Sequence, residues 1–126
     1  MKLLIVDDSS ITRKIIKAVA DVLQMETVEA QDGIEALETL SKIYEEIDLV
    51  LLDWNMPEMN GYDVLVEIKS SEKYKKIPVM MVTTEGHRNN IVAAVRMGAA
   101  NYLTKPFTVE ELEIKIIECI GKGGDF

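Results

Sequence analysis

Five polar residues at the ends of short apolar runs are the part of this sequence best suited to chemistry. Three of them carry carboxylates, one a hydroxyl and one an ammonium group. Any one alone is more simply explained as a helix cap or a solvated surface charge. Taken together, after four separate apolar runs, they favour a functional site. The residues are Asp7, Asp8, Asp53, Thr83 and Lys105.

Asp53 is the hardest of the five to explain as a cap or a surface charge. The preceding residues, 47–52, are apolar except for Asp48, which is typical of a central strand covered on both faces. A carboxylate at the end of such a strand is costly to bury without a partner. Asp53 is therefore the centre of the predicted site.

The three acids predict a site for a divalent cation. Carboxylates held close together cannot all stay ionised without a counter-ion. Mg²⁺, or Mn²⁺ in its place, meets that need because it takes oxygen ligands, commonly one or two carboxylates with several waters. Zinc is disfavoured because His87 is the only histidine and Cys119 the only cysteine.

The same residues fit the transfer of a phosphoryl group onto an aspartate. A carboxylate nucleophile needs neighbours that neutralise the charge of the incoming group. Mg²⁺ and Lys105 would do so, and Thr83 would donate a hydrogen bond to a phosphoryl oxygen. Residues 7–10 are acidic and lack the glycines of a phosphate-cradling loop, which disfavours a nucleotide or flavin carrier.

These residues need a scaffold that brings the ends of several strands together. Apolar runs alternate with segments of helical period along the chain, and Asp32 and Thr108 have the acidic residue three positions on that marks a helix start. Five βα units predict an α/β fold with a parallel sheet and helices on both faces. The carboxyl ends of its strands would share one edge. The expected strands are residues 3–6, 27–30, 47–52, 77–82 and 101–104.

Length and charge limit the remaining classes of function. The 126 residues suffice for one domain, expected over 1–121, with a short glycine-rich tail at 122–126. Twenty-two acids against 14 bases give a net charge of −8, which disfavours nucleic-acid binding. The single cysteine and the absence of a long apolar run predict a cytoplasmic protein with no membrane contact.

Four motifs resemble the receiver domain of two-component response regulators, above all the stand-alone chemotaxis type. They occur in the family's order and at its separations, over essentially the whole chain. The resemblance implies a flavodoxin-like sheet of order 2-1-3-4-5, a monomer, and no enzyme activity beyond taking and losing its own phosphoryl group. The motifs are Val6-Asp7-Asp8-Ser9, Asp53-Trp54-Asn55-Met56-Pro57, Val82-Thr83-Thr84-Glu85 and Lys105-Pro106-Phe107.

The resemblance also implies roles for the acids. Asp53 is expected to be the phosphoacceptor, with a sensor histidine kinase of the chemotaxis type as the donor. Mg²⁺ is expected to bind Asp8, Asp53 and the backbone carbonyl of Asn55, with Asp7 acting mainly through water.

Further implied roles concern the phosphorylated state. Thr83 and Lys105 are expected to sense the phosphoryl group, and Asn55 and Glu85 to tune its loss. The bond from Lys105 to Pro106 is expected to be cis.

The resemblance further implies a switch at some distance from Asp53. Tyr102 is expected to turn inward when Thr83 moves towards the new phosphoryl group. The candidate contacts of a downstream protein are then Ile91, Tyr102 and Lys115, and the resemblance offers the flagellar motor switch as the candidate partner.

Three alternatives stay open at this point. A haloacid-dehalogenase-like phosphatase uses a similar residue set but needs a second acid where this chain has Asn55. A degenerate receiver would lack part of the set that is intact here. The chain is otherwise the receiver of a truncated multidomain regulator, with the glycine-rich end as the start of a linker. Ser9 also stands where the best-known chemotaxis regulator has a large aromatic residue, which weakens the expectation of motor binding.

Overall fold

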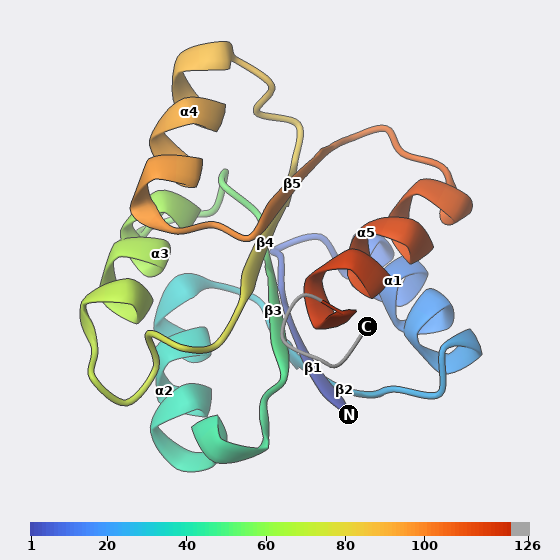
Figure 1. Cartoon of the computed structure of the whole chain (residues 1–126), viewed down its shortest axis with the longest axis horizontal. Coiled ribbons are helices and arrows are strands. Elements are labelled where there is room, and N and C mark those ends of the chain that lie inside the picture. The colour runs from blue at the N-terminus through green and yellow to red at the C-terminus, as the bar shows by residue number, and fades with distance from the viewer. Residues whose placement is uncertain (122–126) are drawn as a thin grey trace.

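The computed structural model describes residues 1–121, which form a three-layer α/β fold (Figure 1). The predicted tail over 122–126 lies outside the described residues. Within the described part, no helix has the length and apolar character needed to cross a membrane. In chain order the elements are β1 (Lys2–Val6), α1 (Ser10–Val22), β2 (Glu26–Ala30), α2 (Gly33–Ile43), the 3₁₀ helix η1 (Tyr44–Glu46), β3 (Leu49–Leu52), α3 (Gly61–Ser70), β4 (Val79–Thr83), α4 (Arg88–Met97), β5 (Asn101–Thr104) and α5 (Val109–Gly121).

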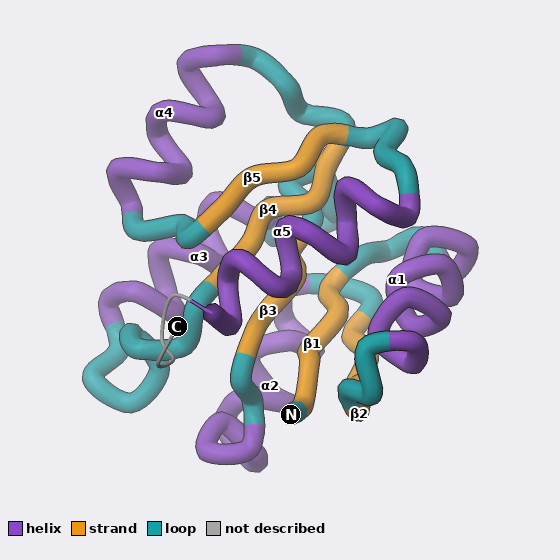
Figure 2. The backbone as a smooth tube through the Cα atoms, turned by 45° about the vertical axis from the view of Figure 1, so that its right-hand side comes forward, coloured by secondary structure: helices purple, strands orange, loops and turns teal. Residues whose placement is uncertain are grey.

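The strands pair in parallel in the order β2-β1-β3-β4-β5, as predicted (Figure 2). From β1 the chain moves outward to β2, and then returns to the other side of β1 to build β3, β4 and β5. The direction of winding therefore reverses between β1 and β3. In open α/β sheets this reversal leaves a crevice at the carboxyl ends of the two strands.

Two apolar layers hold the sheet in place, with α1 and α5 on one face and α2, α3 and α4 on the other (Figure 1). Successive side chains of a strand point to opposite faces. In β1, Leu3 and Ile5 accordingly join the cluster under α1 and α5, whereas Leu4 and Val6 join the cluster on the opposite face. All residues of β3 and β4 are buried. The central strands are thus fixed from both sides, and so are the positions at which they end.

The helix starts follow the predicted capping pattern. They also show whether Asp7 or Asp8 serves as a helix cap. Asp32 accepts a hydrogen bond from the backbone amide three residues later at 2.8 Å. Thr108 and Glu111 form a reciprocal capping box at 3.1 and 2.9 Å. At α1 the cap is Ser9, whose hydroxyl accepts from the amide of Thr12 at 3.2 Å. The two acids before Ser9 are therefore not needed as the cap of this helix.

Two predicted strands begin too early. Strands expected at 47–52 and 77–82 run over Leu49–Leu52 and Val79–Thr83. In the first case the Asp48 carboxylate accepts from the backbone amide of Lys2 at 2.8 Å, outside the ladder. In the second, Pro78 has no amide proton to give to a neighbouring strand. Apolar character extends beyond the paired segment in both cases because the preceding Ile47 and Ile77 are buried as well.

Candidate functional site

The three predicted acids meet at the crevice between the ends of β1 and β3. One carboxylate oxygen from each of Asp7, Asp8 and Asp53 lies within 4.8 Å of the others. Asp7 and Asp53 are only 2% and 5% exposed, whereas Asp8 faces solvent. Two buried carboxylates and one accessible carboxylate thus share a small volume at the surface. The donor set consists of hard oxygen atoms and fits Mg²⁺ or Mn²⁺.

Asp7 is held by partners on both of its carboxylate oxygens. Its Oδ1 accepts from the backbone amide of Ser9 at 2.9 Å, and its Oδ2 accepts from Lys105 Nζ at 2.8 Å. Its own amide donates to the carbonyl of Ala30 at 3.1 Å, which ties the residue to β2. Asp7 is therefore a fixed, charge-compensated carboxylate.

Asp53 is less well compensated. Lys105 Nζ is 3.7 Å from its Oδ2, and the amide of Asn55 donates to its Oδ1 at 3.4 Å. Burial raises the pKa of Asp53, and the negative charge of Asp7 raises it further, while a hydrogen bond with Thr83 and the charge of Lys105 lower it. The net shift is upward, so the ionised form of Asp53 lacks sufficient positive charge around it. A bound cation would supply that charge.

Gly61, which we did not predict as a site residue, shapes the backbone of Asp53. A Cβ at this position would lie 2.0 Å from the carbonyl oxygen of Asp53, too close for any side chain. The Gly61 amide also donates to the carbonyl of Trp54 at 2.7 Å. α3 can therefore begin directly against the segment that carries Asp53. In the sequence Gly61 directly follows Asn60, the cap of α3, but no motif marks its close approach to Asp53.

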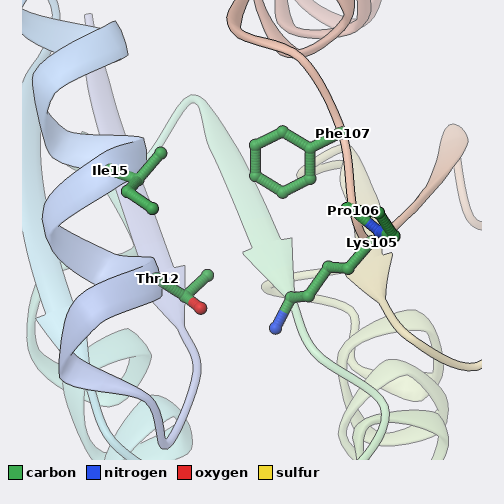
Figure 3. A pocket seen from close by; sticks show the side chains of 5 residues that line it. All are labelled: Thr12, Ile15, Lys105, Pro106 and Phe107. Atoms are coloured by element: carbon green, nitrogen blue, oxygen red, sulfur yellow. The ribbon is translucent and has the colours of Figure 1, made fainter.

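Lys105 and Thr83 reach the site from the neighbouring strands. The amide of Lys105 donates to the carbonyl of Thr83 at 2.8 Å, and the bond from Lys105 to Pro106 is cis, as expected. Lys105 extends from the end of β5 towards the start of α1 (Figure 3). Phe107 and Ile15 lie across a shallow hollow of about 210 Å³ beside it. All five residues predicted from the strand ends therefore gather at one edge of the sheet.

Tyr102 connects β5 to the loop before α4. Its hydroxyl donates to the backbone carbonyl of Glu85. Burial raises the pKa of Tyr102 to about 12, and the negative charges of Glu85 and Asp53 contribute to the rise. The ring is half-buried and packs against the cluster under α3 and α4. Tyr102 therefore links β5, which ends at the site, to the loop that leads into α4.

The remaining predicted residues lie at the rim of the site or farther away. Asn55 is exposed, and its side-chain amide donates to the hydroxyl of Thr84 at 3.4 Å. Ile91 and Lys115 are half-buried and lie on α4 and α5, the two helices that flank β5 on opposite faces of the sheet. They therefore belong to the outer surface around β5 and not to the carboxylate cluster.

Solved structures with the same fold are similar over nearly the whole chain. The chemotaxis protein CheY4 of Vibrio cholerae superposes with a TM-score of 0.86 at 31% identity and covers 94% of this chain and 97% of that one. The Mn²⁺-bound form of the response regulator Rcp1 has a TM-score of 0.78 at 30% identity, covering 96% of this chain and 91% of that one.

The sequence comparisons agree with the site. A chemotaxis protein CheY homolog of Campylobacter jejuni is 43% identical over 124 residues, 98% of this chain and 95% of the relative. CheY1 of Helicobacter pylori is 43% identical over 122 residues, 96% of this chain and 98% of the relative. These matches do not favour a phosphatase of the haloacid-dehalogenase type. Because the family model for the response regulator receiver domain also matches residues 3–117, the chain belongs to the receiver domains of two-component signalling, among the CheY-like chemotaxis regulators.

Proposed function

We propose that Asp53 accepts a phosphoryl group from a sensor histidine kinase and that the resulting charge switches a protein-binding face. The observation that carries this proposal is a buried Asp53 that shares a volume with two further acids and lies 3.7 Å from Lys105. A carboxylate whose pKa is raised by burial and by Asp7 is stabilised when positive groups approach it. The receiver domain, expected over 1–121, would carry the whole of this chemistry.

The carboxylate cluster would hold Mg²⁺, or Mn²⁺ in its place. Asp8 and Asp53 are the proposed side-chain ligands and Asn55 the proposed backbone ligand, while Asp7, with both oxygens already engaged, would act through water. The cation supplies positive charge to the oxygens of the incoming phosphoryl group. The solved Rcp1 structure holds Mn²⁺, which supports a hard divalent cation in this fold.

Besides the cation, three groups of this chain would take part in the transfer to Asp53. A carboxylate oxygen of Asp53 would attack phosphorus as the bond to the donor histidine breaks. Lys105, now 2.8 Å from Asp7 and 3.7 Å from Asp53, would move its charge towards the new phosphoryl oxygens. The Thr83 hydroxyl would donate to one of them. At the rim of the site, Asn55 and Glu85 would control how readily water reaches the aspartyl phosphate.

Phosphorylation would be read on the surface around β5. The phosphoryl group adds about 1.5 to 2 negative charges at pH 7 and three acceptor oxygens. The amide of Glu85 donates to the Thr83 hydroxyl, so movement of Thr83 towards the phosphoryl group would pull on the loop before α4. Tyr102 holds the same loop through the Glu85 carbonyl. Ile91, Tyr102 and Lys115 would then form the face for a downstream protein, and the CheY relatives favour a flagellar motor component.

A labelling experiment tests this function. The protein is incubated with Mg²⁺ and acetyl phosphate, and its mass is measured with and without a chelator. We expect one added phosphoryl group that requires Mg²⁺, is absent in Asp53→Asn and persists in Asp63→Asn, a matched change at an exposed acid of α3. Labelling that survives in Asp53→Asn would refute the assignment of Asp53 as the phosphoacceptor. Repeated turnover of unrelated phosphate esters would instead indicate a phosphatase.

A further inference from the structure

Arg13 makes a bridge that no part of the proposed phosphoryl chemistry uses. Its Nη1 donates to the backbone carbonyl of Asp7 at 2.7 Å, and its Nε donates to the Glu29 carboxylate at 3.0 Å. The Arg13 side chain is 17% exposed and the Glu29 side chain 41% exposed. One guanidinium thus links the first turn of α1, the end of β1 and the strand β2. The forked shape of arginine allows two partners in fixed directions at once.

The bond to Asp7 acts on the peptide group that joins Asp7 to Asp8. A peptide group is planar, so fixing its carbonyl oxygen also fixes the direction from which the next residue starts. The Asp7 amide and both of its carboxylate oxygens already have partners, and Arg13 supplies the partner of its carbonyl. Asp8, the accessible member of the acid cluster, therefore follows a residue whose amide, carbonyl and carboxylate are all hydrogen-bonded.

We propose that Arg13, oriented by Glu29, is a positioning residue that sets the affinity of the acid cluster for Mg²⁺. It does so by holding the peptide between Asp7 and Asp8, so that the carboxylate of Asp8 stays within 4.8 Å of the other two. This inference rests on the metal site of the proposed function. Groups that orient metal ligands without touching the metal commonly change affinity by about 10- to 100-fold when they are lost.

The charge of Arg13 and its positioning role predict opposite effects on Mg²⁺ affinity when the residue is replaced, so an experiment can distinguish them. A positive charge near a cation site repels the cation, so its removal alone would tighten Mg²⁺ binding. Loss of the bond to the Asp7 carbonyl would instead weaken binding, because Asp8 must then be ordered when the cation arrives. The Glu29 carboxylate already offsets the charge of Arg13. The positioning effect is therefore expected to dominate.

Mg²⁺ titration followed by Trp54 fluorescence tests the proposal, since Trp54 is the only tryptophan and follows Asp53 directly. We expect Arg13→Gln to weaken Mg²⁺ binding by about tenfold. Arg13→Lys keeps the charge but lacks the fork, so it should restore only part of the affinity. The matched control is Lys17→Gln on the same helix, which removes an exposed ion pair with Asp21 and should leave Mg²⁺ affinity within about twofold of wild type.

Glu29→Gln tests whether Glu29 affects Mg²⁺ binding by orienting Arg13 or only through its own charge near the site. We expect it to weaken Mg²⁺ binding severalfold in the wild-type background and to have little effect in Arg13→Gln, because Glu29 is proposed to act through Arg13. Equal effects in both backgrounds would show that Glu29 acts independently and would overturn that part of the proposal.

Urea unfolding without metal checks that the variants are folded. If Arg13→Gln is unfolded, the comparison of Arg13→Lys with wild type decides, and equal affinities overturn the proposal. Unchanged or tighter binding in a folded Arg13→Gln also overturns it. If the wild-type protein itself does not respond to Mg²⁺, the proposed metal site fails, and this result is distinct from the failure of Arg13 alone.

Discussion

α3 and α4 have the same length and cover the same face of the sheet, yet they are attached to it very differently (Figure 1). Each has 10 residues and follows a central strand that ends at the site. α3 buries Gly61, Val64, Leu65 and Ile68, whereas α4 buries only Ala94. A helix with little buried apolar surface separates from the sheet at a smaller cost in free energy.

The two helix starts differ in the same sense. The first residue of α3 donates to the Trp54 carbonyl at 2.7 Å and packs directly on the Asp53 backbone. α4 starts from a loop whose cap is His87, which accepts from the Asn89 amide at 3.2 Å. The acceptor thus lies beside a helix that cannot shift without displacing it. The proposed switch lies beside a helix that can shift at low cost, as a two-state element requires.

The largest expected effect comes from removing the close approach at the start of α3. In Gly61→Ala the new Cβ would lie 2.0 Å from the carbonyl oxygen of Asp53, so the helix must move away. We expect a loss of about 3 kcal/mol in the free energy of unfolding, together with weaker Mg²⁺ binding because Asp53 moves too. Urea unfolding and Mg²⁺ titration by Trp54 fluorescence measure the two effects.

Gly86→Ala, in the loop before α4, is the matched control for this change. There the new Cβ would meet Thr104 Cγ2 at 3.4 Å, an ordinary contact. We expect a change in the free energy of unfolding of less than about 0.5 kcal/mol. Equal losses at Gly61 and Gly86 would mean that the two helix starts are equally constrained, contrary to the comparison.

A smaller difference in the free energy of unfolding is expected for substitutions in the middle of the two helices. Val64 in α3 is 0% exposed and Val95 in α4 is 54% exposed. Val64→Ala removes buried methyl groups and leaves a cavity, so we expect a loss of about 2 kcal/mol in the free energy of unfolding. Val95→Ala should change it by less than about 0.5 kcal/mol, because the exposed side chain has little to lose. The gain in helix propensity on replacing valine by alanine is common to both variants.

Native-state hydrogen exchange of the unmodified protein gives an independent measurement. Amides of α4 should open with a smaller free energy than those of α3, and Val64→Ala should reduce this difference. If the two helices exchange with the same free energy in the wild-type protein, the difference in burial does not produce a difference in local stability.

Much of the fold follows from local sequence signals. Apolar runs that end in polar residues predict the strands, and Asp32 and Thr108 mark helix starts that the structure confirms. Strand order is different, because periodicity cannot show which strand neighbours which. That prediction came from the resemblance to receiver domains. The early starts predicted for β3 and β4 have a local cause, since buried Ile47 and Ile77 continue the apolar pattern outside the paired segments.

The sequence predicted the site residues whose side chains carry the chemistry. It did not predict the residues that act through contacts with the backbone. The five polar residues after the apolar runs do converge on one edge. Gly61 and Arg13 act on backbone carbonyls of site residues, and neither contact leaves a pattern in the sequence. A charged residue in the first turn of a helix is usually solvated. Only the packing of α1 against β2 brings Arg13 between Glu29 and Asp7.

The smallest expected effect concerns Tyr102, whose hydroxyl links β5 to the loop before α4, the less buried of the two helices. Tyr102→Phe removes the hydrogen bond to the Glu85 carbonyl, and near pH 7 this should cost about 1 kcal/mol of unfolding free energy or less. Burial raises the pKa of Tyr102 from 10.0 to about 12, so the folded protein holds this proton more tightly than the unfolded chain. The stabilisation from the neutral hydroxyl is therefore fully present below pH 10 and is lost as the pH rises to about 12.

Urea unfolding of wild type and Tyr102→Phe at several pH values between 8 and 12 would test this. The wild-type protein should lose stability relative to the variant across the upper half of that range, because only the wild type has a phenol at position 102, which ionises in the unfolded chain while the folded protein still holds its proton. A difference that stays constant with pH would show that the Tyr102 hydroxyl is not held in a buried bond. α4 would then be no longer linked to β5 through Glu85, and the contrast between the two helices would rest on burial alone.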